Sequence, residues 1–376
     1  MAFRFVHSSD LHLGRRFASI PEAPDGNIRG RLMEARHASI QRLAQVAVES
    51  GAEHILLAGD TFDTSTPSAS VVQQSLAAMA ENANVQWWIL PGNHDNLKDA
   101  EPLWDKIGRE APSNVHALIT PSPIELSSGV RLLPCPVAFR MSGSDPTEGL
   151  ASVATDDGGL RIGLAHAGVV DFNNRGANIS PDRDRTAGLD YLALGDWHGR
   201  LQITERTHYS GSPEQDRFKH GRRGCCLVIS LDSPGAPPFV EDVEIGEFLW
   251  TEDELPLLPD TDVVAALEDI LPQAGHRDIL MRVKATGWAS LRAQSELDAA
   301  AAQCGPNFAH FELSKEHLKT SYNEADIDEI DKGGALRLAA GRLKEDAESE
   351  SLSSEDRSIS AGALARLYSY VKEAEE

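Results

Sequence analysis

The sequence predicts an α/β fold, because strand-like and helix-like segments alternate in the first part of its 376 residues. Short runs of β-branched and aliphatic residues have the length of buried strands, and each run ends abruptly at polar residues. Between the first of them lie two segments, 32–50 and 68–82, whose apolar residues recur at helical spacing. The chain therefore opens with the order β-α-β-α-β. The strand-like runs are 3–9, 54–58, 86–90, 160–165 and 191–194.

Residues with metal-binding side chains follow the five strand-like runs. In open α/β sheets, ligands bind beyond the carboxyl ends of the strands, so side chains at these five ends are expected to converge. Glycine stands next to Asp60, Asn93 and Asp196, where a sharp turn toward a ligand favours a residue without Cβ. The metal-binding side chains are, in chain order, Asp10, His12, Asp60, Asn93, His166, Asp196 and His198.

These ligand types predict a centre of two divalent cations that supports hydrolysis of phosphodiesters. Cations about 3.5–4 Å apart can neutralise charge on the phosphate oxygens and assist the leaving oxygen. Such a pair requires a bridging carboxylate, and Asp60 is the expected bridge. Mixed nitrogen and oxygen ligands suit Mn²⁺, Fe²⁺ or Zn²⁺ better than Ca²⁺. The first cation is expected on Asp10, His12 and His198, and the second on Asn93, His166 and Asp196.

Three other residues of the same segments are expected to support the reaction. His94 follows the ligand Asn93, so its imidazole is expected to contact the scissile phosphate and to protonate the leaving oxygen. His94 and the bridging Asp60 are therefore the predicted catalytic residues. Asp63 and Asp95 are expected to orient the motif loops or to accept hydrogen bonds from the ligand histidines.

The composition changes toward the C-terminus, which predicts a second, smaller domain. Residues 246–262 are acidic and contain proline, and they are expected to form a linker. Residues 263–318 read as helix, strand, helix and strand, the pattern of a small α+β capping domain. Residues 319–376 are expected to hold a mobile acidic loop at 344–358 and a helix at 361–374 that docks either internally or on a partner.

The formal net charge of −23 argues against a protein that binds nucleic acid over its whole surface, because such proteins neutralise phosphates with lysine and arginine. Arginines close to the first motif predict a local DNA-binding edge, although a solvated helix face accounts for each of them equally well. These arginines are Arg15, Arg16, Arg29 and Arg31. The sequence shows neither a leader peptide nor a membrane-spanning segment, so a cytoplasmic location without membrane contact is expected.

Five motifs carry a family resemblance. Ser-Asp-Leu-His-Leu-Gly (9–14), Gly-Asp-Thr-Phe-Asp (59–63), Gly-Asn-His-Asp (92–95), Ala-His-Ala (165–167) and Gly-Asp-Trp-His (195–198) resemble, in type and in order, the motifs of the calcineurin-like metallophosphoesterases. The first two motifs, and Tyr-Ser-Gly-Ser-Pro-Glu at 209–214, are similar to those of the SbcD-type DNA-repair exonuclease subunits. The resemblance covers the first domain, 1–245.

The resemblance implies a two-sheet α-β-β-α sandwich with a small α+β capping domain and a helical C-terminal tail. It also implies manganese-dependent nuclease activity on DNA, dimerisation into a homodimer, and an SbcC-like coiled-coil ATPase as partner. The fifth motif departs from the family, because Asp196 stands where the family usually has histidine. A carboxylate can bind the same cation, and it favours a harder cation than Zn²⁺.

Two other functions remain open on the sequence. The same centre would also serve a phosphodiesterase or phosphatase that acts on small molecules or proteins, which an acidic surface tolerates more easily. The altered fifth motif is also compatible with a degenerate, non-catalytic scaffold subunit. The capping domain discriminates between the first two functions, and the cation content of the protein tests the third.

Overall fold

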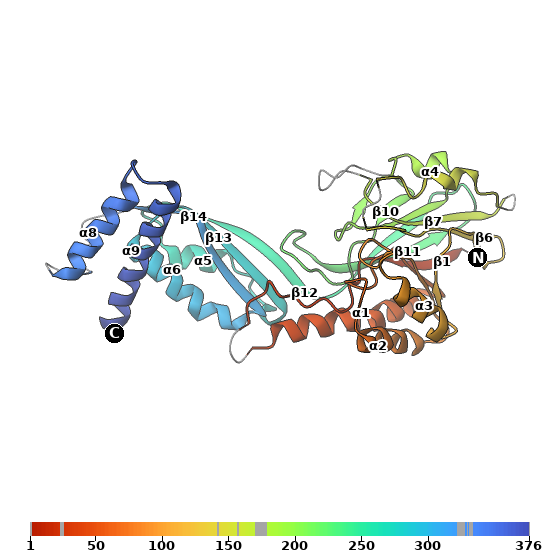
Figure 1. Cartoon of the computed structure of the whole chain (residues 1–376), viewed down its shortest axis with the longest axis horizontal. Helices are drawn as coiled ribbons and strands as arrows, with labels where there is room; N and C mark the ends of the chain where they lie inside the picture. The colour runs from red at the N-terminus through yellow and green to blue at the C-terminus, as the bar shows by residue number, and fades with distance from the viewer. Residues whose placement is uncertain are drawn as a thin grey trace. The chain divides into compact units, whose positions relative to one another are not determined.

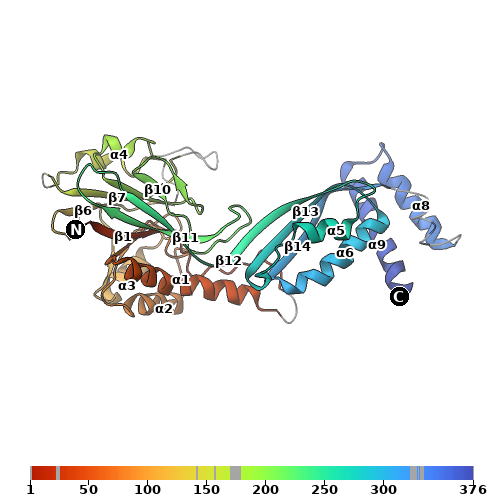
Figure 2. The same cartoon turned by 180° about the vertical axis from the view of Figure 1, so that it is seen from behind.

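The computed structural model describes residues 2–22, 26–140, 143–155, 158–169, 179–321, 328, 330 and 334–375. The chain divides into two compact units, Met1–Leu249 and Trp250–Glu376. Figure 1 labels many of their helices and strands, and Figure 2 shows the same elements from behind.

The first unit contains a sheet whose strands follow the order β12-β11-β1-β2-β3-β4. Strands β1 to β4 are parallel, whereas β11 is antiparallel to both β1 and β12. Parallel neighbours require crossover connections, which the helices supply. The strands are β1 (Phe3–Ser8), β2 (His54–Leu57), β3 (Gln86–Ile89), β4 (Val115–Ala117), β11 (Arg223–Leu231) and β12 (Phe239–Leu257). The helices are α1 (Ile28–Ser50), α2 (Ala69–Ala80) and α3 (Glu101–Glu110).

A second sheet of the same unit has the strand order β5-β6-β7-β8-β10-β9. Strands β6, β7, β8 and β10 are parallel, and β5 and β9 are antiparallel edge strands. The strands are β5 (Ile124–Ser127), β6 (Val130–Cys135), β7 (Leu160–His166), β8 (Tyr191–Gly195), β9 (Leu201–Gln202) and β10 (Thr207–Tyr209). A 3-10 helix (Glu148–Ser152) and the short helix α4 (Arg183–Thr186) accompany this sheet.

Three apolar clusters define the layers of the first unit. One packs α1, α2 and α3 against the first sheet and includes Trp87. The second lies between the sheets, where Phe5 of β1 meets Tyr191 of β8 at a ring-centroid distance of 5.6 Å. The third covers the outer face of the second sheet, next to α4 (Figure 1). The predicted α-β-β-α sandwich is therefore confirmed, and Trp87 and Trp88 of β3 are both buried, so they serve packing.

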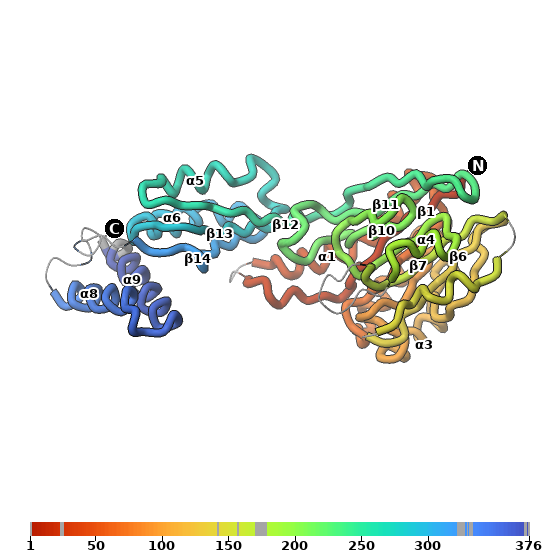
Figure 3. Tube along the Cα trace, turned by 90° about the horizontal axis from the view of Figure 1, so that it is seen from above, coloured from red at the N-terminus to blue at the C-terminus, as the bar shows by residue number. Residues whose placement is uncertain are grey.

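The second unit combines helices with three strands. Strand β13 lies between β12 and β14 in strand order and is parallel to β14. The predicted succession of helix, strand, helix and strand is present as α5 (Val263–Ile270), β13 (Ile279–Ser290), α6 (Leu291–Cys304) and β14 (His310–Ser321). Helices α8 (Ala335–Glu348) and α9 (Ser354–Glu375) follow, and they lie side by side in Figures 1 and 3. Among the described residues, every helix lacks either the length or the continuous apolar stretch that a membrane-spanning segment requires.

The predicted linker at 246–262 is largely a strand. Strand β12 continues to Leu257, so only residues 258–262 connect it to α5. The buried residues of this strand form two pairs of alternate positions, Phe248 with Trp250 and Leu255 with Leu257. The acidic composition suggested a linker, but the period of two in the buried residues is typical of a strand.

The predicted mobile loop at 344–358 is also wrong in large part, because α8 extends to Glu348 and α9 begins at Ser354. Ser353 stabilises the start of α9: its hydroxyl accepts a hydrogen bond from the backbone N–H of Asp356 and donates one to the Asp356 carboxylate. This is a helix-start signal within a serine-rich acidic segment. Leu364 and Tyr368 of α9 are buried in a cluster with Leu291, so this helix packs internally.

Candidate metal centre

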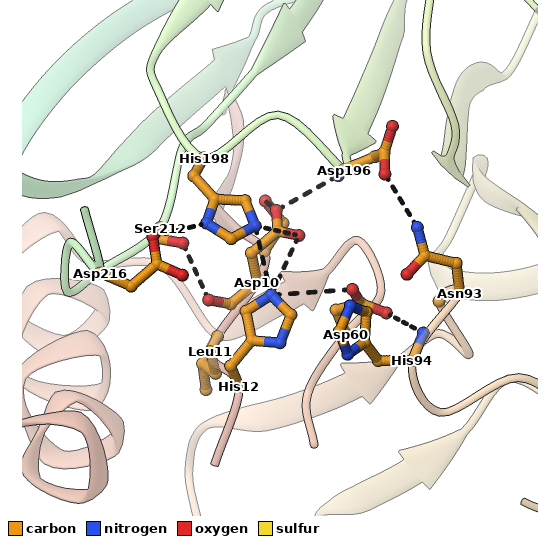
Figure 4. A network of polar contacts seen from close by, with 12 residues as sticks. Asp10, Leu11, His12, Asp60, Asn93, His94, Asp196, His198, Ser212 and Asp216 are labelled. Atoms are coloured by element: carbon orange, nitrogen blue, oxygen red, sulfur yellow. Dashed lines mark hydrogen bonds and ion pairs between the residues drawn. The ribbon is translucent and has the colours of Figure 1, made fainter. Parts of the chain in front are cut away.

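The carboxyl ends of five strands bring the predicted ligands together. Asp10 and His12 follow β1, and Asp60 and Asn93 follow β2 and β3. In the second sheet, His166 is the last residue of β7, and Asp196 and His198 follow β8. Figure 4 shows six of these seven side chains by label, gathered from different parts of the chain. The convergence predicted from the polar ends of the strands is therefore present.

The backbone of four of these residues has positive φ. The values are 54° for Asp10, 45° for His12, 52° for Asp60 and 96° for Asp196. Residues with a Cβ rarely adopt this region, and each such conformation costs on the order of 1–3 kcal/mol. The four residues keep it because the hydrogen bonds of their loops hold it, for example from the Asp10 N–H to the Gly59 carbonyl at 3.1 Å. Such strain is typical of functional sites.

Two histidines of the cluster are oriented by Asp63. The Nδ1 atom of His12 lies 3.4 Å from a carboxylate oxygen of Asp63, and the Nδ1–H of His94 donates to the Asp63 carbonyl at 2.7 Å. The two imidazole rings meet edge to face at a centroid distance of 4.8 Å. Since Nδ1 of each ring faces Asp63, Nε2 is the nitrogen that each can offer to a ligand.

The other two histidines follow the same pattern. The Nδ1–H of His166 donates to the Ala58 carbonyl at 2.7 Å, and Nδ1 of His198 lies 3.1 Å from a carboxylate oxygen of Asp216. Histidines that bind metals through one nitrogen usually donate the other N–H to a carboxylate or carbonyl oxygen. In all four histidines, Nε2 is therefore the nitrogen that can bind a cation or contact a substrate.

The first half of the centre consists of Asp10, His12 and His198. The Nε2 atoms of the two histidines are only 3.2 Å apart, and they lie 3.9 Å and 3.8 Å from Oδ1 of Asp10. Bonds of about 2.0–2.2 Å to a shared cation place ligand atoms at separations of this size. The other oxygen of Asp10 accepts bonds from the Ser9 hydroxyl and the Asp196 N–H, whereas Oδ1 is buried and has no hydrogen-bond partner among the described residues.

The second half contains His166, Asn93 and Asp196. Nε2 of His166 is buried without a hydrogen-bond partner in the described structure, and it lies 3.9 Å from a carboxylate oxygen of Asp196. The amide nitrogen of Asn93 donates to that same oxygen at 2.9 Å, which leaves the amide oxygen for a cation (Figure 4). Asp196 is thus placed where it can replace the histidine that the family usually has.

Asp60 lies between the two halves. Its Oδ2 atom is 3.7 Å from Nε2 of His12 and 3.5 Å from Nε2 of His166, and its Oδ1 accepts the backbone N–H of His94 at 2.9 Å. One carboxylate oxygen facing both halves is the arrangement that a bridging ligand needs. Gly92 allows this approach, because a Cβ there would come within 2.2 Å of the Asp60 carboxylate and 2.3 Å of its backbone nitrogen.

The electrostatics of the cluster favour bound positive charge. Burial opposes ionisation of Asp60, yet the neighbouring His166 and His12 lower its pKa below the usual range. Burial likewise opposes the charge of His166, but Asp60 raises the pKa of this imidazole well above its ordinary value. Burial raises the pKa of the Asp196 carboxyl. Buried carboxylates are stable only when paired with positive charge or bound to metal, so the donor set fits divalent cations.

Asp95 and Asp63 support the motif loops. The Asp95 carboxylate is fully buried and accepts the backbone N–H groups of Phe62 at 3.0 Å and Gly92 at 2.7 Å, so it ties the second motif to the third. Burial and the nearby Asp60 raise the pKa of Asp95 to about 7. Asp63 lies against His12 and His94, and Asp95 contacts backbone rather than a histidine.

Asp216 and Arg36 complete the centre. Sequence reasoning assigned Asp216 no role and counted Arg36 only among the basic residues after the first motif that could meet DNA. Asp216 lies against His198 and also forms ion pairs with Arg15 at 3.1 Å and Arg217 at 2.9 Å. Arg36 is 1% exposed and donates to the backbone carbonyls of Asp10 and Leu11 at 3.3 Å and 2.6 Å. The only sequence signal for Asp216 was its position two residues after the segment 209–214.

Three of the four arginines predicted to bind DNA have partners within the protein. Arg15 forms ion pairs with two of the carboxylates that orient ligand histidines. Arg29 donates to the carbonyls of Ala18 and Ile20, and the guanidinium of Arg31 lies 5.0 Å from the ring centroid of Phe248. Arg16 is exposed. DNA binding by these four residues stays a prediction.

We expect Asp216→Asn to weaken cation binding in the first half of the centre by about 10- to 100-fold, the usual effect of removing a partner that orients a metal ligand. The amide keeps the shape of Asp216 but not the charge that holds the His198 imidazole. Isothermal titration of the metal-free protein with Mn²⁺ measures the change. Asp216→Glu should restore part of the affinity, and an unaltered titration of Asp216→Asn would show that His198 needs no carboxylate.

An α-β-β-α sandwich with Asp, His and Asn side chains at its strand ends is typical of a metal-dependent hydrolase. The sequence model of the family "Calcineurin-like phosphoesterase" matches residues 3–198, a range that contains all seven predicted ligands. The chain belongs to the calcineurin-like phosphoesterase family. Membership indicates a phosphoester hydrolase that uses divalent cations, and the cluster supplies candidate ligands for them.

Two curated relatives come from Bacillus subtilis (strain 168). The uncharacterised metallophosphoesterase YhaO is 29% identical over 238 residues, which are 60% of this chain and 56% of YhaO. The SbcD subunit of the nuclease SbcCD is 31% identical over 111 residues, which are 28% of this chain and 26% of SbcD. The matches therefore span about half of the first relative and about a quarter of the second.

Solved structures of low sequence identity also resemble the chain. The protein TT1561 of Thermus thermophilus has a TM-score of 0.38 and 10% identity, and the match covers 56% of this chain and 90% of that one. A dimetal phosphatase from Danio rerio has a TM-score of 0.33 and 9% identity, with coverages of 63% and 98%.

Proposed function

We propose that this protein hydrolyses phosphodiester bonds of DNA with two divalent cations, most readily Mn²⁺. The observation that carries the proposal is the set of buried ligand atoms without hydrogen-bond partners among the described residues, Oδ1 of Asp10 and Nε2 of His166, on either side of Asp60. When bound, two cations would neutralise charge on the phosphate oxygens and assist the leaving oxygen. Asp10, His12 and His198 would hold one, Asn93, His166 and Asp196 the other, and Asp60 would bridge them.

The protein side chains contribute orientation and proton transfer. Asp63 and Asp216 hold the rings of His12 and His198, so these ligands need little rearrangement when a cation or substrate binds. His94 is anchored through Nδ1, and its Nε2 is the group we assign to the proton donated to the leaving oxygen. Proton donation requires contact with the substrate, so His94 is a catalytic residue in this proposal.

DNA is the substrate that we favour among phosphodiesters. The support is the partial match to a protein described as a nuclease subunit, together with the first-motif sequence and segment 209–214. On the same basis we propose a homodimer and an SbcC-like coiled-coil ATPase as partners. The alternative is a phosphodiesterase for small molecules or phosphoproteins. The net charge of −23 favours it, because a negatively charged protein repels polyanions such as DNA.

Cleavage assays distinguish the two functions. Purified protein is incubated with linear duplex DNA, single-stranded DNA, bis(4-nitrophenyl) phosphate or a cyclic nucleotide, with Mn²⁺ and with a chelator. Mn²⁺-dependent cleavage of DNA supports the proposal. Efficient hydrolysis of the small diesters with intact DNA contradicts the nuclease function and supports the alternative. Binding of no Mn²⁺ at saturating concentration would instead favour a scaffold subunit.

We expect Asp196→Ala to weaken the second cation site and to leave the first near its normal affinity. The Asp196 side chain contacts Asn93 and His166, whereas its link to Asp10 is a backbone N–H that the substitution keeps. In a titration with Mn²⁺, the number of bound ions per chain should fall from two to about one over the concentrations that the titration covers. Asp196→His is the matched variant, since it restores the usual family residue. Two ions bound by Asp196→Ala would remove Asp196 from the ligand set.

A further inference from the structure

A basic loop follows Asp216 directly. Its sequence, Arg-Phe-Lys-His-Gly-Arg-Arg at 217–223, contains four cationic residues and no carboxylate, in a chain of net charge −23. Arg217 and Lys219 are exposed, and Arg222 and Arg223 are partly exposed. Sequence reasoning placed the DNA-binding edge elsewhere, on the arginines that follow the first motif.

This basic loop is attached to the metal centre through the fifth motif. The guanidinium of Arg217 donates to Asp216 at 2.9 Å and lies 3.4 Å from Nδ1 of His198. Lys219 places its ammonium 4.3 Å from the ring centroid of Trp197, the residue between Asp196 and His198. The His220 ring meets the same indole edge to face at 5.3 Å. The position of the loop relative to the ligand residues is therefore set by packing.

Nearby carboxylates do not cancel the positive charge of the loop. Asp242 pairs with Arg222 at 3.0 Å and with Arg200 at 3.2 Å, and Glu244 lies 3.6 Å from Arg222. The ion pairs of the described residues set three carboxylates, Asp216, Asp242 and Glu244, against Arg200, Arg217 and Arg222. Lys219 and Arg223 add two further positive charges to the loop. No carboxylate of the described residues lies within ion-pair distance of Lys219, an exposed residue whose ammonium lies over the Trp197 indole.

We propose that the basic loop binds the phosphodiester backbone of a nucleic-acid strand beside the scissile bond. The inference rests on the proposed function and specifies its substrate as a polynucleotide that extends past His198. Lysine and arginine contacts to phosphates give affinity that depends on salt and not on base sequence. A surface of this charge next to the fifth motif also accounts for DNA binding by a protein whose overall charge opposes it.

Lys219→Ala in the full chain tests the loop. The ratio of kcat/KM for single-stranded DNA to kcat/KM for bis(4-nitrophenyl) phosphate is expected to fall about 3- to 10-fold. The slope of log affinity for DNA against log salt concentration should become less steep by about one unit, because one phosphate contact is lost. Lys319→Ala is the matched control: Lys319 is another exposed lysine, with its ammonium 5.2 Å from the ring centroid of Trp288. This control should keep both the ratio and the slope.

Two results would overturn the inference about the basic loop and leave the proposed nuclease function intact. If wild-type protein cleaves DNA and Lys219→Ala keeps the wild-type ratio and slope, the loop makes no backbone contact. If Lys319→Ala lowers the ratio as much as Lys219→Ala does, total charge and not this loop determines DNA binding. Failure of the wild-type protein to cleave DNA, with hydrolysis of the small diester intact, would overturn the proposed nuclease function itself and is recognised before any variant is made.

Discussion

Asp60→Asn is expected to abolish hydrolysis and to empty both halves of the metal centre. The amide keeps the size of the side chain but loses the charge and the second anionic oxygen, and Asp60 is the only residue whose carboxylate lies within 4 Å of both His12 and His166 among the described residues. Since the cations contribute several kcal/mol to the transition state, kcat/KM should fall by at least about 10³-fold.

The expected loss of cations is measured directly, by elemental analysis of protein equilibrated with Mn²⁺ and then desalted. Asp105→Asn, an exposed aspartate on α3, controls for the loss of one negative charge and should keep wild-type activity and metal content. Circular dichroism confirms that Asp60→Asn is folded. Two tightly bound ions per chain in folded Asp60→Asn would contradict the bridging role and would require a different carboxylate in that position.

The layers and the clustering of the candidate ligands could be predicted from the sequence because they depend on local patterns. A strand such as β8 is a short apolar run with a polar residue at its end, and parallel strands place such ends at one edge of a sheet. The chemistry of the centre therefore depends on residues adjacent to strands. The positive φ of Asp10 and Asp60 could not be predicted, because it arises from hydrogen bonds between two loops, such as that from the His12 N–H to the Asp60 carbonyl.

Sequence reasoning missed, for a related reason, residues that contact the metal centre but lie far from its motifs in the sequence. Asp216 is a neighbour of His198 only after β10 returns the chain to the centre, and no spacing rule marks that contact. Arg36 belongs to an arginine-rich segment typical of a solvated helix face, yet its guanidinium is buried beneath Asp10. In the second unit, composition suggested a linker and a loop, whereas alternating burial and the Ser353 hydrogen bonds show a strand and a helix start.

His94→Asn is expected to keep both cations and to lower kcat for DNA by about 10²- to 10⁴-fold, the usual contribution of a general acid. His94 contributes a backbone N–H to Asp60, and the substitution preserves that bond. Its imidazole is fixed by the Asp63 carbonyl at 2.7 Å, so Nε2 is the nitrogen that can face a substrate. Asparagine has no group that can transfer a proton at neutral pH.

Substrates with different leaving groups distinguish two roles of His94, proton donation and metal binding. The 4-nitrophenolate of bis(4-nitrophenyl) phosphate departs without a proton, so His94→Asn should retain much more activity on this diester than on DNA. Because His94 also lies near His12 and Asp60 in a group that could hold an ion, Mn²⁺ titration is measured on the same preparation. Equal losses on both substrates together with weaker Mn²⁺ binding would identify His94 as a metal ligand, and equal losses with normal Mn²⁺ binding would identify it as a residue that positions the phosphate.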